Sequence, residues 1–124
     1  MDAPFNNPVE LVIELPMPPT TNNLFATVGK KRIRTVEYKA WAQEAGYLLN
    51  KQRPPLMAGK VAILIEVAEP KTAHRQDCTN RIKAVEDLLV SHRVIQGDDQ
   101  RFVREVTTRW APVEGCRVTV RPCA

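Results

Sequence analysis

The segment Val-Ala-Ile-Leu-Ile-Glu-Val at residues 61–67 constrains the fold most, because apolar side chains occupy all but one of its positions. A near-continuous apolar run of this length is typical of a strand in the interior of a sheet. We therefore expect residues 61–67 to form a central strand with other strands paired on both sides. A second, helical pattern must then cover the sheet.

Two helical patterns accompany this central strand. After Thr35, which can cap a helix, apolar residues recur at helical spacing until about residue 51, before Pro54 and Pro55. A second helical pattern covers 77–91. Strand patterns cover 9–15, 24–28, 32–35, 102–110 and 116–121, and 24–35 is expected to be a short hairpin. This order predicts an α+β fold, with a mixed β-sheet and two packed helices.

Length and composition set the remaining bounds. A chain of 124 residues is expected to fold as one domain spanning 1–124, with 1–8 a flexible N-terminus. No apolar run reaches the roughly 20 residues needed to span a bilayer, and the N-terminus lacks the pattern of a signal peptide, so cytoplasmic residence is expected. The net charge of +4 permits nucleic-acid binding without establishing it.

The segment 77–99 concentrates acidic residues in this basic chain. Wound as a helix at about 100° per residue, residues 77–91 separate into two faces. The apolar face carries Cys78, Ile82, Val85 and Leu89. The opposite face carries Asp77, Asn80, Lys83 and Asp87, and a following turn brings Asp98 and Asp99. Carboxylates beside an ammonium group are suited to holding a divalent cation against a phosphate.

A purely structural interpretation explains the same residues. Asp77 or Thr79 could cap the helix, Lys83 could pair with Asp87 across one turn, and the Asp98-Asp99 pair could simply form a turn. Spacing alone leaves both interpretations open.

Basic residues gather on either side of the acidic segment. They are Lys30, Lys31, Arg32 and Arg34 in the predicted hairpin, with Lys71 and Arg75 before the second helix. Such cations could grip the backbone of a polyanion, or they could keep an exposed strand edge soluble. The polar loop 20–23 could likewise touch sugar and phosphate, or satisfy its own backbone.

Two stretches carry a resemblance to a known family. Residues 15–23 read Leu-Pro-Met-Pro-Pro-Thr-Thr-Asn-Asn, and residues 75–83 read Arg-Gln-Asp-Cys-Thr-Asn-Arg-Ile-Lys. The first resembles the strand and Pro-Pro-Ser-x-Asn loop of the RusA family of Holliday-junction resolvases. The second resembles the Arg-x-Asp-x-Asp-Asn-x-x-Lys motif of that family, and Gly-Asp-Asp at 97–99 follows at nearly the family spacing. The resemblance spans roughly residues 10–121.

The resemblance implies a metal-dependent endonuclease that resolves four-way DNA junctions as a homodimer, in a family often carried by prophages. Magnesium is the implied cofactor, with manganese an alternative. By position, Asp77 matches the first catalytic aspartate, Lys83 the catalytic lysine and Asp99 the later aspartate. Asp98 is the alternative to Asp99, and Asn80 matches the motif's asparagine.

The chain departs from this motif at Thr79, where the family has its second catalytic aspartate. Losing a carboxylate should weaken metal binding, which Asp87 or Asp98 could partly offset. Two alternatives to an active nuclease therefore stay open. One is a junction-binding protein that cuts poorly or not at all, and the other is a structural or interaction domain whose acidic residues are only caps and turns.

Overall fold

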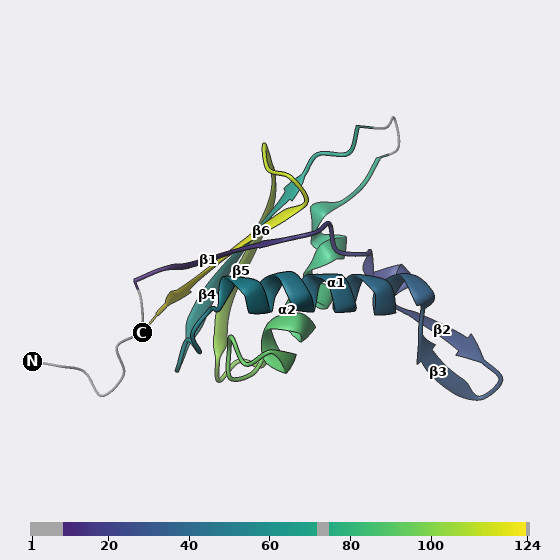
Figure 1. Ribbon diagram of the computed structural model, residues 1–124, viewed down its shortest axis with the longest axis horizontal. Helices are drawn as coiled ribbons and strands as arrows, with labels where there is room; N and C mark the ends of the chain where they lie inside the picture. Colours follow the sequence, from purple (N-terminus) through teal and green to yellow (C-terminus); the bar gives the residue numbers. More distant parts are fainter. Residues whose placement is uncertain (1–8, 72–74, 124) are drawn as a thin grey trace, which may run out of the picture.

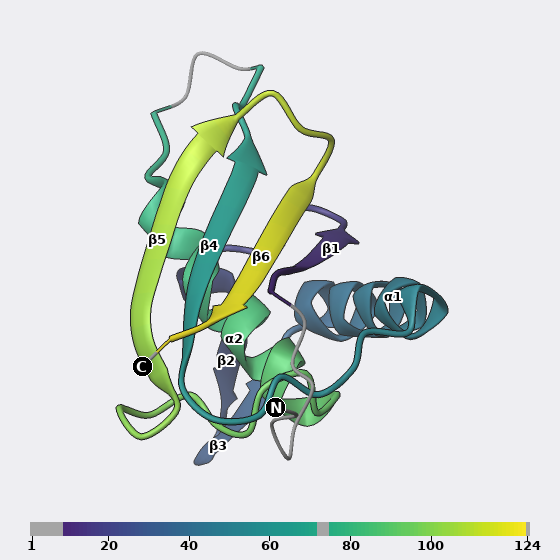
Figure 2. The same cartoon turned by 90° about the vertical axis from the view of Figure 1, so that its left-hand side faces the viewer.

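The computed structural model describes residues 9–71 and 75–123, so the expected flexible N-terminus at 1–8 lies outside the described residues. Its main sheet has four strands in the order β1-β6-β4-β5 (Figure 2). Their bounds are Leu11–Leu15 for β1, Val61–Ala68 for β4, Val103–Ala111 for β5 and Cys116–Pro122 for β6. The expected central position of the apolar strand is confirmed, since β4 pairs with β5 on one side and β6 on the other.

The sheet is mixed, as the order of elements predicts. β4 runs parallel to β5 and antiparallel to β6, and β6 runs antiparallel to β1. A parallel neighbour requires a crossover connection, and here that connection contains the second helix. The α+β fold class with two packed helices is therefore confirmed.

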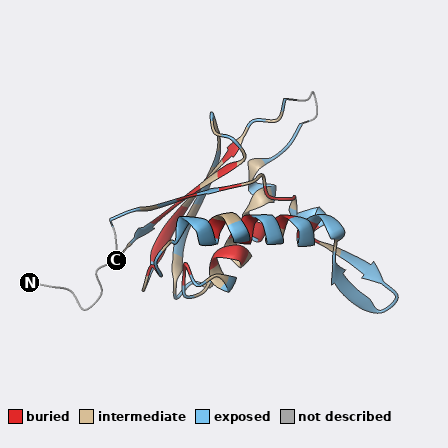
Figure 3. Ribbon diagram, viewed as in Figure 1, coloured by how far each residue is buried: buried red, intermediate tan, exposed pale blue. Residues whose placement is uncertain are grey.

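Both helices lie on the same face of the sheet (Figure 1). They are α1, Val36–Gln52, and α2, Ile82–Ser91. Thr35 caps α1 as expected, because its hydroxyl accepts a hydrogen bond of 3.1 Å from the backbone N–H of Tyr38. Buried residues gather between the helices and the sheet (Figure 3). In the described part of the chain, no helix is long and apolar enough to cross a bilayer.

The expected second helix is wrong in its first turn. Residues Cys78–Arg81 form a 3-10 helix, η2, and the α-helix begins only at Ile82. The carbonyl of Cys78 accepts a hydrogen bond from Thr108, and that of Asn80 accepts one from Thr21. These bonds from outside the helix hold the turn in its tighter form. The apolar face is otherwise as expected, with Val85 and Leu89 fully buried.

The predicted hairpin forms a separate two-stranded sheet rather than joining the main one. It consists of β2, Phe25–Val28, and β3, Lys31–Arg34, and it projects away from the body of the protein beyond α1 (Figure 1). Its turn needs Gly29, whose φ of 62° is a left-handed conformation that other residues rarely adopt. The basic tip thus stands at the end of an exposed arm.

Candidate catalytic site

The segment that precedes α2 is fixed from three directions. The hydroxyl of Thr21, in the 3-10 turn Thr21–Asn23 (η1), donates to the carbonyl of Asn80 over 3.0 Å. From the sheet, Thr108 donates to the carbonyl of Cys78 over 3.3 Å. The third contact is made by the guanidinium of Arg81, which donates to the carbonyl of Pro18 in the proline-rich loop. These contacts come from elements far apart in the sequence, so the segment takes its position only in the folded chain.

Arg81 joins the proline-rich loop to the start of the acidic segment. Its guanidinium donates to the carbonyl of Pro18 and to Oε1 of Gln76, the latter over 2.7 Å. The loop is itself anchored, since the indole N–H of Trp41 donates to the carbonyl of Pro16 over 3.0 Å. The proline-rich loop therefore serves as a fixed support for the residues beside Asp77.

Asp77 stands at the entrance of η2, and its carboxylate is unengaged among the described residues. Its backbone is extended, with φ of −102° and ψ of 127°, and its side chain makes no capping hydrogen bond. The residue is exposed, and within the part of the chain that the structure describes no ion pair or hydrogen bond engages its carboxylate. The structural interpretation of Asp77 or Thr79 as a helix cap is therefore wrong, because neither η2 nor α2 has a side-chain cap.

Lys83 lies between two carboxylates. Its Nζ is 3.1 Å from Oδ1 of Asp87 and 3.6 Å from Oδ2 of Asp98. The expected pair across one turn of the helix is thus present, and Asp98 joins it from the segment after α2. The hydrogen bond with Asp87 raises the pKa of Lys83, although partial burial opposes this, so the side chain is an ammonium ion at neutral pH.

Asp99 has a different partner from Asp98. Its carboxylate accepts from Nε and Nη2 of Arg101, over 3.0 and 2.8 Å, and from the backbone N–H of Arg101 over 2.9 Å. These bonds lower the pKa of Asp99 to about 2. The Asp98-Asp99 pair does form a turn, as the structural interpretation expected. The turn directs the carboxylate of Asp98 to Lys83 and that of Asp99 to Arg101.

Three residues that lie near Asp77 or near the cluster of Lys83, Asp87 and Asp98 were not predicted from the sequence as site residues. Burial raises the pKa of Glu86, and the charge of Asp98 adds to this effect. Burial also raises the pKa of Tyr38 in α1, and the negative charge of Asp87 raises it further. The third is Arg81. The position of Glu86 one turn from Lys83 was a readable signal, whereas no sequence pattern marks the two contacts of Arg81.

The carboxylates offer oxygen ligands, which magnesium and manganese prefer. Among residues 9–71 and 75–123, however, no three side chains of histidine, cysteine, aspartate or glutamate gather closely enough to hold a metal ion. Asp98 and Asp87 gather around Lys83, while Asp99 turns to Arg101. The donor chemistry fits a hard divalent cation, and the described geometry brings only part of the expected set together.

The expected DNA-binding residues are exposed. In the hairpin, the guanidinium of Arg32 lies 4.2 Å from the ring centre of Phe25, and that of Arg34 lies 5.0 Å from the ring centre of Tyr38. The other four, Lys30 and Lys31 near the turn, Lys71 and Arg75, are also exposed. Asn80 is exposed too; its backbone carbonyl accepts from Thr21, and its backbone N–H donates to the carbonyl of Asp77.

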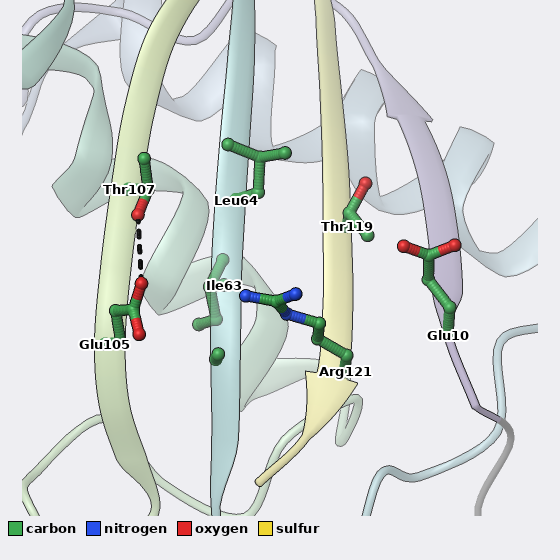
Figure 4. A pocket seen from close by; sticks show the side chains of 8 residues that line it. Glu10, Ile63, Leu64, Glu105, Thr107, Thr119 and Arg121 are labelled. Atoms are coloured by element: carbon green, nitrogen blue, oxygen red, sulfur yellow. Dashed lines mark hydrogen bonds between the residues drawn. The ribbon is translucent and has the colours of Figure 1, made fainter.

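The sheet face that the helices leave open carries a separate shallow hollow of about 180 Å³. Figure 4 shows Arg121 reaching from β6 towards β4, between Glu10 and Glu105. None of the carboxylates around Lys83 lines this hollow. The candidate site therefore lies at the α2 crossover and not in this depression.

Comparison with known protein families matches residues 16–121 to the family described as Endodeoxyribonuclease RusA. The match places the chain in a class of endodeoxyribonucleases, hydrolases that act on DNA. More particularly, the chain belongs to the RusA family, because the match covers nearly the whole chain. The resemblance read from the two sequence motifs is confirmed. A comparison with curated proteins found no match.

Proposed function

We propose that this protein is a divalent-metal-dependent endonuclease that resolves four-way DNA junctions in recombination and repair. The observation that carries the proposal is Asp77. Among the described residues nothing engages its carboxylate, and it stands on a segment that Thr21, Thr108 and Arg81 hold in place. This segment leads into the helix that carries Lys83, whose Nζ lies near the carboxylates of Asp87 and Asp98. Within the part of the chain that the structure describes, Asp77 serves neither in a cap nor in an ion pair, so both of its oxygens are open to a ligand.

We propose Asp77 and Asp99 as the main metal ligands, with Asp98 or Asp87 assisting. Magnesium needs only one or two carboxylates, because water fills its remaining positions. Manganese accepts the same donors. When bound, the metal would activate water and neutralise charge on the phosphate. Asp99 would exchange Arg101 for the metal, since both partners use the same carboxylate oxygens.

Lys83 would act as a fixed positive charge rather than as a base. Its raised pKa keeps the amine protonated, so it has no lone pair to accept a proton at neutral pH. An ammonium held by Asp87 and Asp98 can stabilise the negative charge that develops on the phosphate or on the departing oxygen.

DNA would be gripped by exposed cations on both sides of this cluster. The proposed contacts are Lys30, Lys31, Arg32, Arg34, Lys71, Arg75 and Asn80. Phosphate contacts of this kind make affinity fall steeply with salt. We propose that the protein acts in the cytoplasm as a homodimer, because two-fold symmetry presents two sites to two opposed strands of a junction.

The test is cleavage of a labelled synthetic four-way junction beside a linear duplex of equal length. Reactions contain magnesium, manganese or chelator, with the wild-type protein and Asp77→Asn. The expected result is paired, metal-dependent nicks in the junction alone, which Asp77→Asn abolishes while keeping the wild-type unfolding curve. Equal cutting of duplex and junction, or full activity of Asp77→Asn, would contradict the proposal.

A second candidate is a junction-binding protein with an impaired site. Thr79 favours it, because a neutral, exposed side chain stands where the family motif has an aspartate. Thr79→Asp discriminates between the two. A marked gain in metal-dependent cleavage would identify an impaired nuclease site, and unchanged cleavage from an active wild type would mean that the remaining carboxylates suffice.

A further inference from the structure

The projecting hairpin β2–β3 has two chemically different faces. Side chains alternate along a strand, and paired residues of an antiparallel ribbon point to the same side. The pairs Phe25–Arg34 and Thr27–Arg32 therefore share one face, where both guanidinium groups lie over aromatic rings. The opposite face comprises the pairs Ala26–Ile33 and Val28–Lys31. We call this second side, with Ala26, Val28 and Ile33, the apolar face of the hairpin.

This apolar face is open to solvent. Val28 is 59% exposed and Ile33 42% exposed, although both are β-branched apolar residues. The hairpin pairs with no other strand of the described sheets, and Figure 3 shows it exposed along its length. Two strands alone are marginally stable in water, so the hairpin gains from any partner that covers its apolar face.

The base of the hairpin is attached to the candidate site. The hydroxyl of Thr35 donates to the carbonyl of Asn23 over 2.6 Å, and its N–H donates to the carbonyl of Leu24 over 3.0 Å. The ring of Phe25 meets that of Tyr38 edge to face, with centres 5.8 Å apart. Tyr38 in turn lines the same small cavity as Asp87. The base of the hairpin therefore lies beside the carboxylate–lysine cluster, and the arm extends outward from it (Figure 1).

Charge identifies the partner. Lys30 and Lys31 at the turn and Arg32 and Arg34 along β3 are all positive, and the hairpin strands and their turn contain no acidic residue. A second copy of the same arm would be repelled by this charge, whereas a polyanion is attracted. A two-stranded ribbon fits the major groove of DNA, and apolar side chains can contact thymine methyl groups or insert beside bases.

We propose that this hairpin enters branched DNA, with Val28 and Ile33 contacting bases at the branch point while the surrounding cations hold the phosphates. This inference rests on the proposed junction-directed function and adds the element that recognises the branch. Continuous stacking is interrupted at a branch point, so base faces are accessible there at lower cost than within a duplex. The apolar contact therefore provides preference for the branch, and the cations provide affinity for any DNA.

The test compares two double variants in binding assays run in chelator, so that cleavage plays no part. Val28→Thr/Ile33→Thr removes the apolar surface but keeps the β-branching that suits a strand. Lys30→Gln/Lys31→Gln removes two charges from the same arm. Val12→Thr is the matched control, because Val12 is 47% exposed on β1, away from the hairpin. Fluorescence anisotropy measures affinity for a four-way junction and a duplex over a salt series.

We expect Val28→Thr/Ile33→Thr to lose roughly tenfold in junction affinity, from the loss of apolar burial, with duplex affinity and salt dependence unchanged. Lys30→Gln/Lys31→Gln should weaken binding to both DNAs and reduce the salt slope by about two. A 2-aminopurine base at the branch point should brighten on binding of the wild type and the Val12→Thr control, and less with Val28→Thr/Ile33→Thr.

Each contrary result has a distinct meaning. Equal affinity of the wild type for junction and duplex would overturn the proposed function and this inference together. A wild-type preference for junctions that Val28→Thr/Ile33→Thr retains would overturn the inference alone. A lower dimer fraction of that variant in sedimentation without DNA would assign the apolar face to a second copy, and would also overturn it.

Discussion

Replacing Lys83 with methionine should show whether the ammonium group of Lys83 serves catalysis or only stabilises the fold through its ion pairs. Methionine keeps an unbranched side chain on the helix but removes the ammonium group. The pair with Asp87 is an i,i+4 contact between side chains that are 49% and 31% exposed. Exposed pairs of this kind contribute about 0.3–0.5 kcal/mol to stability. The longer contact of 3.6 Å with Asp98 adds no more than that.

The free energy of unfolding should therefore fall by less than about 1 kcal/mol in Lys83→Met. Both carboxylates keep access to water, so no buried charge is left unpaired. Activity should respond far more strongly. Removing one preorganised group that stabilises developing charge typically lowers kcat about 10²- to 10³-fold. The two magnitudes are far enough apart for one variant to distinguish the roles.

The assay is single-turnover cleavage of a four-way junction, together with urea unfolding of the same preparations. Lys39→Met is the control, because Lys39 is an exposed lysine of α1, and its cleavage rate should match the wild type. Cleavage by Lys83→Met within about threefold of the wild-type rate, against the loss expected for a charge-stabilising group, would refute the catalytic role. Loss of several kcal/mol of stability would instead show that the pair is structural.

Further predictions concern the metal, the core and a buried thiol. Arg101→Gln should free the carboxylate of Asp99 and raise metal affinity about two- to fivefold in a calorimetric titration, the equivalent of an exposed ion pair; unchanged affinity would point to Asp98 as the ligand. Leu89→Ala, at a fully buried position of α2, should lower the free energy of unfolding by about 2–5 kcal/mol in urea. Burial raises the pKa of Cys116 to about 12, so its thiol should react with a thiol reagent at about pH 8 only after unfolding. The same raised pKa contributes stability that is complete below about pH 8.5 and is lost as the pH rises towards 12.

Elements with strong local patterns could be predicted from the sequence. The apolar run of β4 identified the central strand, and Thr35 marked the start of α1. The segment Cys78–Arg81 could not be predicted in the same way, because bonds from Thr21 and Thr108 hold its carbonyls. Helical periodicity describes only contacts within one element, so it extended the helix over a turn that tertiary contacts fix as 3-10.

The same distinction applies to the candidate site, where contacts within one helix were predictable and contacts between elements were not. The spacing of Lys83 and Asp87 predicted their ion pair, since both lie on one face of α2. Sequence could not decide between Asp98 and Asp99, whose carboxylates diverge within a single turn to Lys83 and Arg101. The role of Arg81 could not be predicted either, because its partners are a backbone carbonyl of the proline-rich loop and a neighbouring glutamine, and no sequence pattern marks such contacts.

The parallel pairing of β4 with β5 also bears on when the chain becomes active. All the candidate carboxylates lie in the connection between these two strands, residues 69–102. Closing so long a connection loses conformational entropy before the strands' contacts compensate it, so such pairings form late and slowly in folding. A nascent or partly unfolded chain would hold these residues apart, on an unclosed loop. The candidate site would then be assembled only after the slowest contact of the fold has formed.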